Sequence, residues 1–446
     1  MATRKLRAKA LLTRSLFGAT ALATVAVLAA CSGTSPGNGD SDADTPSGEL
    51  QILVSSADAS DAAFKAITDG FEKKYPDVNV TLSSVSNDNY PATKSSRLTA
   101  GNVDIFVVKN FVEAPSYAKD STSDDVLLAK SGGLLDLTDE PFMSKYTKSV
   151  LDTQAIDGKQ FAVPTGLSYS TGVYYNKSIF EKYGLSVPTT WSELENVMST
   201  LKSNNVTPFG IGGKDTWPAG LPMLGAVAGA YPTAADKAAL AQGLWENTTS
   251  LTDPAPLGVL EKTETIFQNA QPSFSGTGYD EIPSGFAAGK FAMTADGTWN
   301  EPTIKTAVNG AFDYGYFPFP ASDNAQDNAL LNGKIELQLG VAAGTKNKTA
   351  ALAWLSYFSD PANYQTFVEK SGFSPSQPDI PVTPFLESIK QYTSTFEPAW
   401  DMLWIANNKA GQDAVYPFNY PALAPLGSNT AQQAAQAAQA AWKAAF

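Results

Sequence analysis

A regular alternation of apolar runs and helical patterns near the start of the chain constrains its fold more than any other feature. Short apolar runs predict strands and runs with helical spacing predict helices, in the order 50–54 (strand), 60–75 (helix), 78–82 (strand), a second helix ending at 99, and 103–108 (strand). This strand-helix-strand-helix-strand order predicts a largely parallel sheet covered by helices, and hence an α/β fold.

Polar residues follow each of these three predicted strands. In sheets of this kind ligands bind beyond the carboxyl ends of the strands. We therefore expect Asp58, Lys109 and Asn110 to contact a ligand, with Asn87 beside them on the same cleft wall. Polar residues also follow many strands that have no binding role, so a purely structural role stays open at each position.

The stretch from Asp157 to Gly184 predicts a crossover between two lobes. Two short strands, 161–163 and 173–175, flank a polar loop, and a helix with a capping box at Ser178 follows. A chain of 446 residues also exceeds what one core usually supports. Together these features predict two lobes.

The segment GKQFAVPTG...GVYYNKSIFEKYG resembles the central part of bacterial extracellular solute-binding proteins of the sugar-binding, maltose-binding-protein-like family. Other stretches that resemble the family, in the same order, are FEKKYPDVNV, AGNVDIFVV, TWSEL, TPFGIGGKDTWPAG, FAAGKFAM...GTWN and AALAWLSYF. The resemblance covers residues 50 to 370. The segment NGKIELQLGVAAG departs from the family, because it carries Glu336 and Gln338 where relatives often have a glycine-rich apolar strand.

The resemblance implies a two-lobe fold of the periplasmic-binding-protein type II, with three hinge crossings and a mainly parallel, helix-flanked sheet in each lobe. The first lobe is expected to contain residues 49–164 and 313–343, and the second 165–312 and 344–446. The predicted strands 312–319 and 335–341 would accordingly return to the first lobe.

The N-terminus resembles a bacterial lipoprotein leader. Residues 1–30 combine a basic start with an apolar run that ends in Leu-Ala-Ala before Cys31, which is the only cysteine. We expect Cys31 to be lipidated and residues 31–48 to form a flexible tether with a mean reach of roughly 20 to 25 Å. The protein would then lie outside the cytoplasm, held on the outer face of the cell membrane by its lipid alone. Cleavage beside an incidental cysteine is the alternative.

Composition excludes several classes of function. The chain has no histidine, so histidine-dependent nucleophile arrangements and imidazole metal sites are impossible, and no metal or cofactor is expected. The leader holds five of the 31 basic residues and none of the 44 acidic ones, which leaves a net charge of −18 and argues against nucleic acid. Arg97 is the only arginine after the leader, which favours neutral ligands over carboxylates and phosphates.

Tryptophans on loops are the strongest binding signal. A pyranose ring needs flat aromatic platforms edged with polar side chains. Trp217 has Asp215 nearby, and Trp299 is followed by Asn300, so both loops fit this requirement. A tryptophan is also often half-buried structure, and that alternative applies to both positions.

Four further residues are candidates for ligand contact. Trp400 and Trp404 lie one helical turn apart, so one would edge the cleft while the other packs. Tyr169 lies in the crossover loop, and Glu336 is either a ligand contact or part of a polar strand face. Trp191, by contrast, lies on an apolar helical stripe and is expected in the core.

The resemblance and these residues predict a monomeric, lipid-anchored substrate-binding component of an ATP-driven importer. It would bind a neutral mono- or oligosaccharide between its lobes and deliver it to membrane permease subunits, without being an enzyme. Two alternatives stay open: a protein of the same fold for a peptide or polyamine, and a surface glycosidase or lyase acting through paired carboxylates.

Overall fold

The computed structural model describes residues 45–446, except residues 56, 412–413 and 415–417. The predicted leader, Cys31 and the tether up to residue 44 therefore lie outside the described residues, as does the side chain of Asp58. Within the described part of the chain, no helix is long and apolar enough to cross a membrane.

The first lobe is built on a five-stranded sheet in the order β2-β1-β3-β10-β4. Strand β1 (Gly48–Ser55) pairs in parallel with β2 (Val78–Val85) and β3 (Ile105–Val107), as the alternating pattern predicts. Strand β10 (Leu339–Val341) continues this sheet and pairs in the antiparallel sense with both β3 and β4 (Ala162–Val163). A strand from the last quarter of the chain thus completes the first lobe.

Helices α1 (Asp58–Lys74), α12 (Lys348–Phe358) and α13 (Pro361–Ser371) belong to the core of the first lobe. The ring centroids of Phe64 and Phe367 are 4.9 Å apart, and Trp354 is fully buried in the same core. The expectation that residues after 344 join the second lobe is therefore wrong for α12 and α13. Their apolar stripes pack on the helix that follows the first strand.

The second lobe contains the sheet β7-β6-β8, formed by Met293–Asp296, Gly172–Asn176 and Tyr314–Pro318. All pairs of these strands are antiparallel, so the expectation of a mainly parallel sheet in each lobe is wrong here. The expected return of 312–319 to the first lobe is also wrong, because β8 pairs along the full length of β6. Helices cover both faces, since Val173 and Tyr174 point into different apolar clusters.

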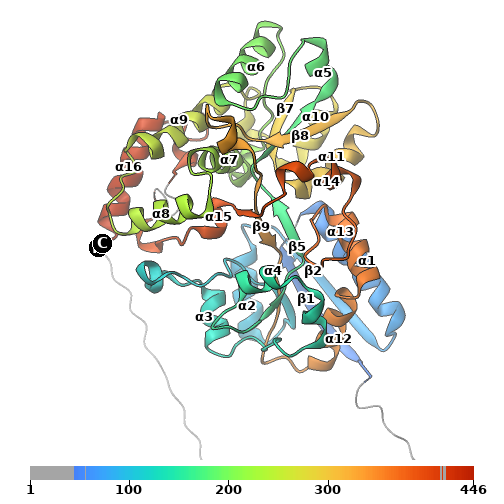
Figure 1. The fold of residues 1–446 in the computed structure, drawn as a ribbon. Coiled ribbons are helices and arrows are strands. Elements are labelled where there is room, and N and C mark those ends of the chain that lie inside the picture. Colours follow the sequence, from blue (N-terminus) through green and yellow to red (C-terminus); the bar gives the residue numbers. More distant parts are fainter. Residues whose placement is uncertain (1–44, 56, 412–413, 415–417) are drawn as a thin grey trace, which may run out of the picture. The chain divides into compact units, whose positions relative to one another are not determined.

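A third, three-stranded sheet joins the lobes in the order β11-β9-β5. Its strands are Glu397–Pro398, Asn332–Glu336 and Gly166–Tyr169, and it lies between the other two sheets in Figure 1. Strands β5 and β9 each lie on a passage of the chain between the lobes. The third passage follows α13 instead of residue 343: it runs between Ile380 in the first-lobe core and Leu386 in a second-lobe cluster, and β11 comes after it.

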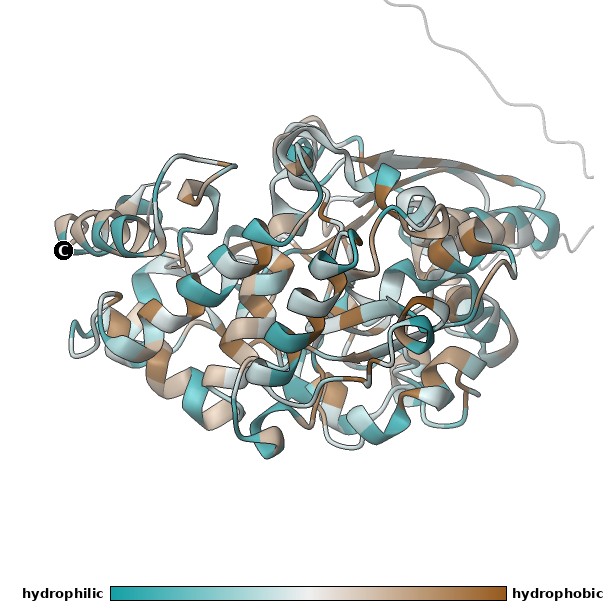
Figure 2. Cartoon of the chain, turned by 90° about the horizontal axis from the view of Figure 1, so that it is seen from above, coloured by the Kyte–Doolittle hydropathy of each residue, from teal (hydrophilic) through white to brown (hydrophobic). Residues whose placement is uncertain are grey.

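The remaining helices lie mostly in the second lobe, and most carry both hydrophilic and hydrophobic residues (Figure 2). Trp191 packs in the second-lobe core as predicted, with 9% of its surface exposed. The bounds of these remaining helices are α2 Tyr90–Ala100, α3 Asp124–Lys130, α4 Lys148–Gln154, α5 Lys177–Lys182, α6 Trp191–Ser203, α7 Leu221–Ala230, α8 Ala234–Trp245, α9 Pro254–Gln268, α10 Ile282–Ala287, α11 Glu301–Val308, α14 Pro384–Ser388, α15 Trp400–Leu403 and α16 Ala431–Ala444.

Candidate functional site

A cleft of about 1650 Å³ is lined by residues of the first lobe, the joining sheet and the second lobe. The carboxyl ends of β1 and β3 contribute one wall, as expected for parallel strands that end at the same edge of a sheet. Lys109 and Asn110 follow β3, and Ser55 ends β1. The residues beyond the carboxyl ends of these strands, where the sequence predicts ligand contacts, therefore lie in the cleft wall.

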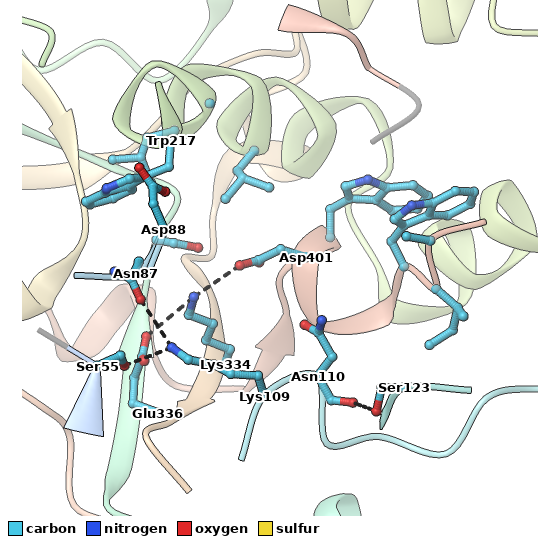
Figure 3. Close-up of a pocket in the computed structure, with 18 of the residues that line it drawn as sticks. Ser55, Asn87, Asp88, Lys109, Asn110, Ser123, Trp217, Lys334, Glu336 and Asp401 are labelled. Carbon is cyan, nitrogen blue, oxygen red and sulfur yellow. Dashed lines mark hydrogen bonds and ion pairs between the residues drawn. The ribbon is translucent and has the colours of Figure 1, made fainter. Parts of the chain in front are cut away.

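Lys109 is the central cation of the first-lobe wall. Its Nζ donates hydrogen bonds to Ser55 Oγ at 2.8 Å and to Asn87 Oδ1 at 3.2 Å (Figure 3). The same Nζ lies 5.4 Å from the centre of the Tyr90 ring. Burial lowers the pKa of Lys109 to about 8, because its charge loses hydration. An ammonium group has three donors, so one N–H beyond these two hydrogen bonds is able to point to a ligand.

Lys334 and Glu336 extend the charged centre from the joining sheet. They lie two residues apart on β9 and so share one face of the strand. Lys334 Nζ is 3.1 Å from Asp401 Oδ2 and 3.7 Å from Glu336 Oε1, while Ser168 Oγ donates to Glu336 Oε1 at 2.6 Å. Burial opposes the charge on Lys334, but Asp401 and Glu336 outweigh it and raise the pKa of Lys334 above its usual range. Lys334 therefore stays charged.

Trp217, Tyr279 and Trp299 form an aromatic group on the second-lobe side of the cleft. The Trp217 ring lies 4.6 Å from that of Tyr279 and 6.4 Å from that of Trp299, measured between centroids. Both tryptophans are only partly buried, and all three side chains line the cleft. Rings arranged in this way offer flat apolar faces to a ligand.

A buried carboxylate holds this aromatic group in place. Trp299 Nε1 donates to Tyr279 Oη at 2.8 Å, and Tyr279 Oη donates to Asp296 Oδ1 at 2.9 Å. Asn300 Nδ2 donates to Asp296 Oδ2 at 2.6 Å, and the backbone N–H of Tyr279 donates to Asp215 Oδ2 at 2.7 Å. Burial raises the pKa of Asp296 to about 7. The hydrogen bonds that its carboxylate accepts from Asn300, the Gly297 backbone N–H and Tyr279 oppose that rise.

Backbone strain accompanies the cleft at three places. The φ angles of Asn110, Thr216 and Leu337 are 50°, 61° and 40°, in a region that L-residues rarely occupy. Thr216 directly precedes Trp217, and Leu337 directly follows Glu336. Such strain persists where surrounding contacts over-determine the backbone, and it is concentrated at functional sites.

Two polar atoms in the cleft wall are buried without a hydrogen-bond partner among the described residues. They are Ser170 Oγ and Asp401 Oδ1. Ser170 is only 1% exposed, so bulk water does not compensate for the missing bond. A buried polar group without a partner costs about 1 to 3 kcal/mol.

Most predicted site residues line this cleft. They are Lys109, Asn110, Asp215, Trp217, Trp299, Asn300, Glu336, Trp400 and Trp404. The Asp58 side chain lies outside the described part of the structure.

Tyr169 does not line the cleft. It is 4% exposed and packs in a second-lobe cluster with Tyr174 and Tyr316. Side chains alternate along a strand, so Ser168 and Ser170 face the opposite side from Tyr169. The loop position that the sequence suggested for Tyr169 is in fact the end of β5.

Trp400 and Trp404 line the cleft but are almost fully buried, with 3% and 7% of their surfaces exposed. Their rings stack at 5.2 Å with an interplanar angle of 20°, and Trp404 lies 5.3 Å from Trp442. The expected division between one cleft residue and one packing residue is not found, because both belong to the second-lobe core.

Tyr279, Lys334, Asp401 and Ser170 were not among the residues predicted for the site. Two signals could have identified the first two: Tyr279 follows Gly276 and Gly278 on a loop, and Lys334 shares a strand face with Glu336. Asp401 and Ser170 carry no comparable sequence signal, since their role depends on what the folded chain places beside them.

Comparison with known proteins agrees with this architecture. The model of the family described as bacterial extracellular solute-binding protein matches residues 55–365, more than half of the chain. An uncharacterised ABC transporter extracellular-binding protein of Pyrococcus horikoshii is 28% identical over 335 residues, which cover 72% of this chain and 70% of that protein. The multiple sugar-binding protein of Streptococcus mutans is 25% identical over 317 residues, or 70% of this chain and 71% of that protein.

Among solved structures, the solute-binding protein RafE in complex with raffinose superimposes with a TM-score of 0.73 at 23% identity, covering 89% of this chain and 99% of that one. This likeness supports the two-lobe α/β fold. With the family match over residues 55–365, it leads to one conclusion: the chain belongs to the bacterial extracellular solute-binding protein family.

Proposed function

We propose that this protein binds a neutral sugar in the cleft between its lobes and delivers it to the permease of an ABC importer. The observation that carries the proposal is the Trp217–Tyr279–Trp299 group, a set of aromatic platforms on a cleft wall. Lys109, Glu336 and Asp401 edge the same cleft with donors and acceptors for hydroxyl groups.

The relatives support a sugar over other solutes. The name of the Streptococcus mutans relative states that it binds multiple sugars, and the RafE structure contains raffinose. The charges at the centre of the cleft agree, because Lys334 is paired with Asp401 and lies near Glu336.

The proposed mechanism is a shift in population between open and closed arrangements of the lobes. Two of the three connections run through the joining sheet at β5 and β9, and the third follows α13. Bending in these segments would change the cleft without disturbing either core. A ligand that contacts both lobes only when they are closed favours closure by the free energy of those extra contacts.

Addition of the right sugar is expected to stabilise the protein and to lower its radius of gyration. A ligand at 100 times its dissociation constant adds about 2.7 kcal/mol to the free energy of unfolding. A thermal-unfolding screen over mono- and oligosaccharides, with polyamines and short peptides as comparison solutes, measures the first effect. Small-angle scattering measures the second. Stabilisation by polyamines or peptides alone would contradict the proposal, and release of shorter sugars would indicate a glycosidase.

We also propose that lipid on Cys31 anchors the protein to the outer face of the membrane. The support is the Leu-Ala-Ala-Cys sequence and the Gly/Ser/Asp-rich residues that follow it. Cys31→Ser is expected to release a folded, sugar-binding protein from the membrane fraction, because both lobes and the cleft are built from residues after 44. Cell fractionation with wild type as control tests this, and a variant retained on the membrane would contradict it.

A further inference from the structure

Asp296 is a buried carboxylate whose charge is supported by hydrogen bonds. It ends β7, is 1% exposed, and takes part in none of the ion pairs among the described residues. Its Oδ1 accepts from the backbone N–H of Gly297 at 2.8 Å and from Tyr279 Oη at 2.9 Å. Its Oδ2 accepts from Asn300 Nδ2 at 2.6 Å. Hydrogen bonds to an ionised acceptor are roughly twice as strong as neutral ones, so the charge of Asp296 strengthens all of these contacts at once.

The donors belong to the segments that carry the aromatic group. Gly297 and Asn300 flank the turn on which Trp299 lies. The Tyr279 ring packs 4.6 Å from that of Trp217, which Figure 3 shows at the cleft. A phenol hydroxyl has a single hydrogen, and Tyr279 Oη accepts from Trp299 Nε1 while it donates to the buried carboxylate. The carboxylate is thus the last acceptor of a chain that begins at the Trp299 ring.

Phenols and carboxyls are the titratable groups of the elements around Asp296. They are Tyr174 of β6, Tyr316 of β8, Glu301 of α11, and Tyr279 and Asp215 on the neighbouring loops. Helices α7 and α10 also pack against β7 and carry no titratable side chain. Burial raises the pKa of both Tyr174 and Tyr316 well above the usual range, so these phenols stay neutral. The charge on Asp296 is therefore the one in this group that changes near neutral pH.

Protonation of Asp296 would loosen its hold on the rings. Because the charged form loses hydration on burial, the pKa of Asp296 is raised to about 7. A bound proton turns one carboxylate oxygen into a donor, and the remaining hydrogen bonds lose their charge assistance. The new O–H then faces Asn300 Nδ2 or Tyr279 Oη, both of which donate to the charged form.

We propose that Asp296 is a positioning residue that holds the Trp217–Tyr279–Trp299 group in its binding arrangement only when ionised, so that the cleft loses affinity for its ligand as the medium becomes acidic. This inference rests on the proposed function and adds control by pH to it. Asp296 is buried and does not line the cleft, so it acts on the ligand through the rings that it orients.

The lysines of the cleft would not produce this dependence on pH. Burial lowers the pKa of Lys109 to about 8, so its charge is lost as the pH rises, and any contribution to binding changes in the opposite direction. Lys334 Nζ lies 5.8 Å from the centre of the Trp299 ring. Lys334 stays charged because, against the cost of burial, Asp401 and Glu336 raise its pKa. A gain of affinity as the pH rises to neutrality therefore reports an acid.

The first test measures affinity against pH. Calorimetric titrations with raffinose, maltotriose, cellotriose and xylotriose are made at about pH 6 and about pH 7.5 on wild type, Asp296→Asn and the control Glu301→Gln. The ionised fraction sets the apparent affinity, so wild-type affinity is expected to rise roughly five- to tenfold between these pH values. Asp296→Asn should bind at both pH values about as weakly as wild type at pH 6. Glu301 is another buried carboxyl, bonded to Tyr314 and outside the cleft lining, so Glu301→Gln should keep the rise.

The second test needs no ligand. Near-ultraviolet circular dichroism reports the packing of tryptophan and tyrosine rings, and a transition near pH 7 is expected in ligand-free wild type and Glu301→Gln but not in Asp296→Asn.

Stability should change in the opposite direction to affinity. The folded-state pKa of Asp296 lies above the ordinary value of 3.8, so protonation of this group stabilises the fold, and that stabilisation is lost as the pH rises through about 7. Relative to Asp296→Asn, wild type should gain resistance to urea from about pH 7 to about pH 5 while its affinity falls. A weaker affinity at low pH would then not be a consequence of unfolding.

The outcomes separate the two proposals. If none of these sugars binds wild type at either pH, the proposed function is contradicted, and the circular-dichroism transition alone decides the role of Asp296. If sugars bind equally well at both pH values, or if Asp296→Asn keeps the rise, the positioning role is wrong while the proposed function stands. Absence of the transition in wild type also overturns it. If Asp296→Asn does not fold, Tyr279→Phe, which removes the hydroxyl between Trp299 and the carboxylate, should reduce the rise instead.

Discussion

Trp299→Ala and Trp217→Ala are each expected to weaken sugar binding at least about thirtyfold, or about 2 kcal/mol, while the protein remains folded. Both rings are partly exposed on the cleft wall, and Trp299 also packs against the cores of both lobes. Its truncation would remove a platform for the ligand and a contact where the lobes meet. Calorimetric titration with the sugar that stabilises the wild type measures the loss.

Conservative variants provide the matched controls. Trp299→Phe keeps an aromatic face but loses the donor to Tyr279 Oη, and Tyr279→Phe keeps its ring but loses the hydroxyl between Trp299 and Asp296. Both should bind more tightly than Trp299→Ala if stacking dominates. Near-native affinity in a folded Trp299→Ala or Trp217→Ala protein would remove that residue from the site.

Trp442→Ala is expected to destabilise the protein by about 3 to 5 kcal/mol, the usual cost of truncating a buried tryptophan. Trp442 is 1% exposed, lies 5.3 Å from both Trp245 and Trp404, and donates from Nε1 to Leu244 O at 2.7 Å. Through this residue α16 packs against the rings of Trp245 and Trp404. Urea unfolding of the variant and the wild type gives the difference in free energy.

Trp442→Phe separates ring packing from the hydrogen bond. It retains most of the buried area, so a smaller loss of stability is expected than for Trp442→Ala. Trp217→Ala is a second control, since a partly exposed ring contributes less to the core. An unfolding midpoint of Trp442→Ala equal to that of wild type would show that the tryptophan cluster does not stabilise the second lobe.

The two groups of tryptophans differ in a way that local sequence conceals. Trp217 and Trp299 follow turns and stay partly exposed, whereas Trp400 and Trp404 sit at a short helix and are nearly buried. Helical spacing correctly placed Trp400 and Trp404 near each other, as their stacked rings confirm. It could not show that Trp245 and Trp442 approach from distant helices and pack against Trp404.

The sequence by itself determined the features that depend on local pattern. Apolar periodicity predicted β1, α1, β2 and β3, and the polar residues after parallel strands led to Lys109 and Asn110 at the cleft. Turn context led to the loops of Trp217 and Trp299. These predictions succeeded because strand ends, caps and turns are set by neighbouring residues, and because a parallel arrangement brings strand ends to one edge.

Only the tertiary structure decided which distant segments meet. The apolar run of β8 would fit either sheet, and its pairing with β6 followed from contacts that no local pattern encodes. The same holds for α12 and α13 on the first lobe and for Lys334 beside Asp401, 67 residues away. A side chain's exposure and partners depend on the packing of elements that are distant in the sequence. Tyr169 is therefore buried in a core cluster, whereas Tyr279 lines the cleft.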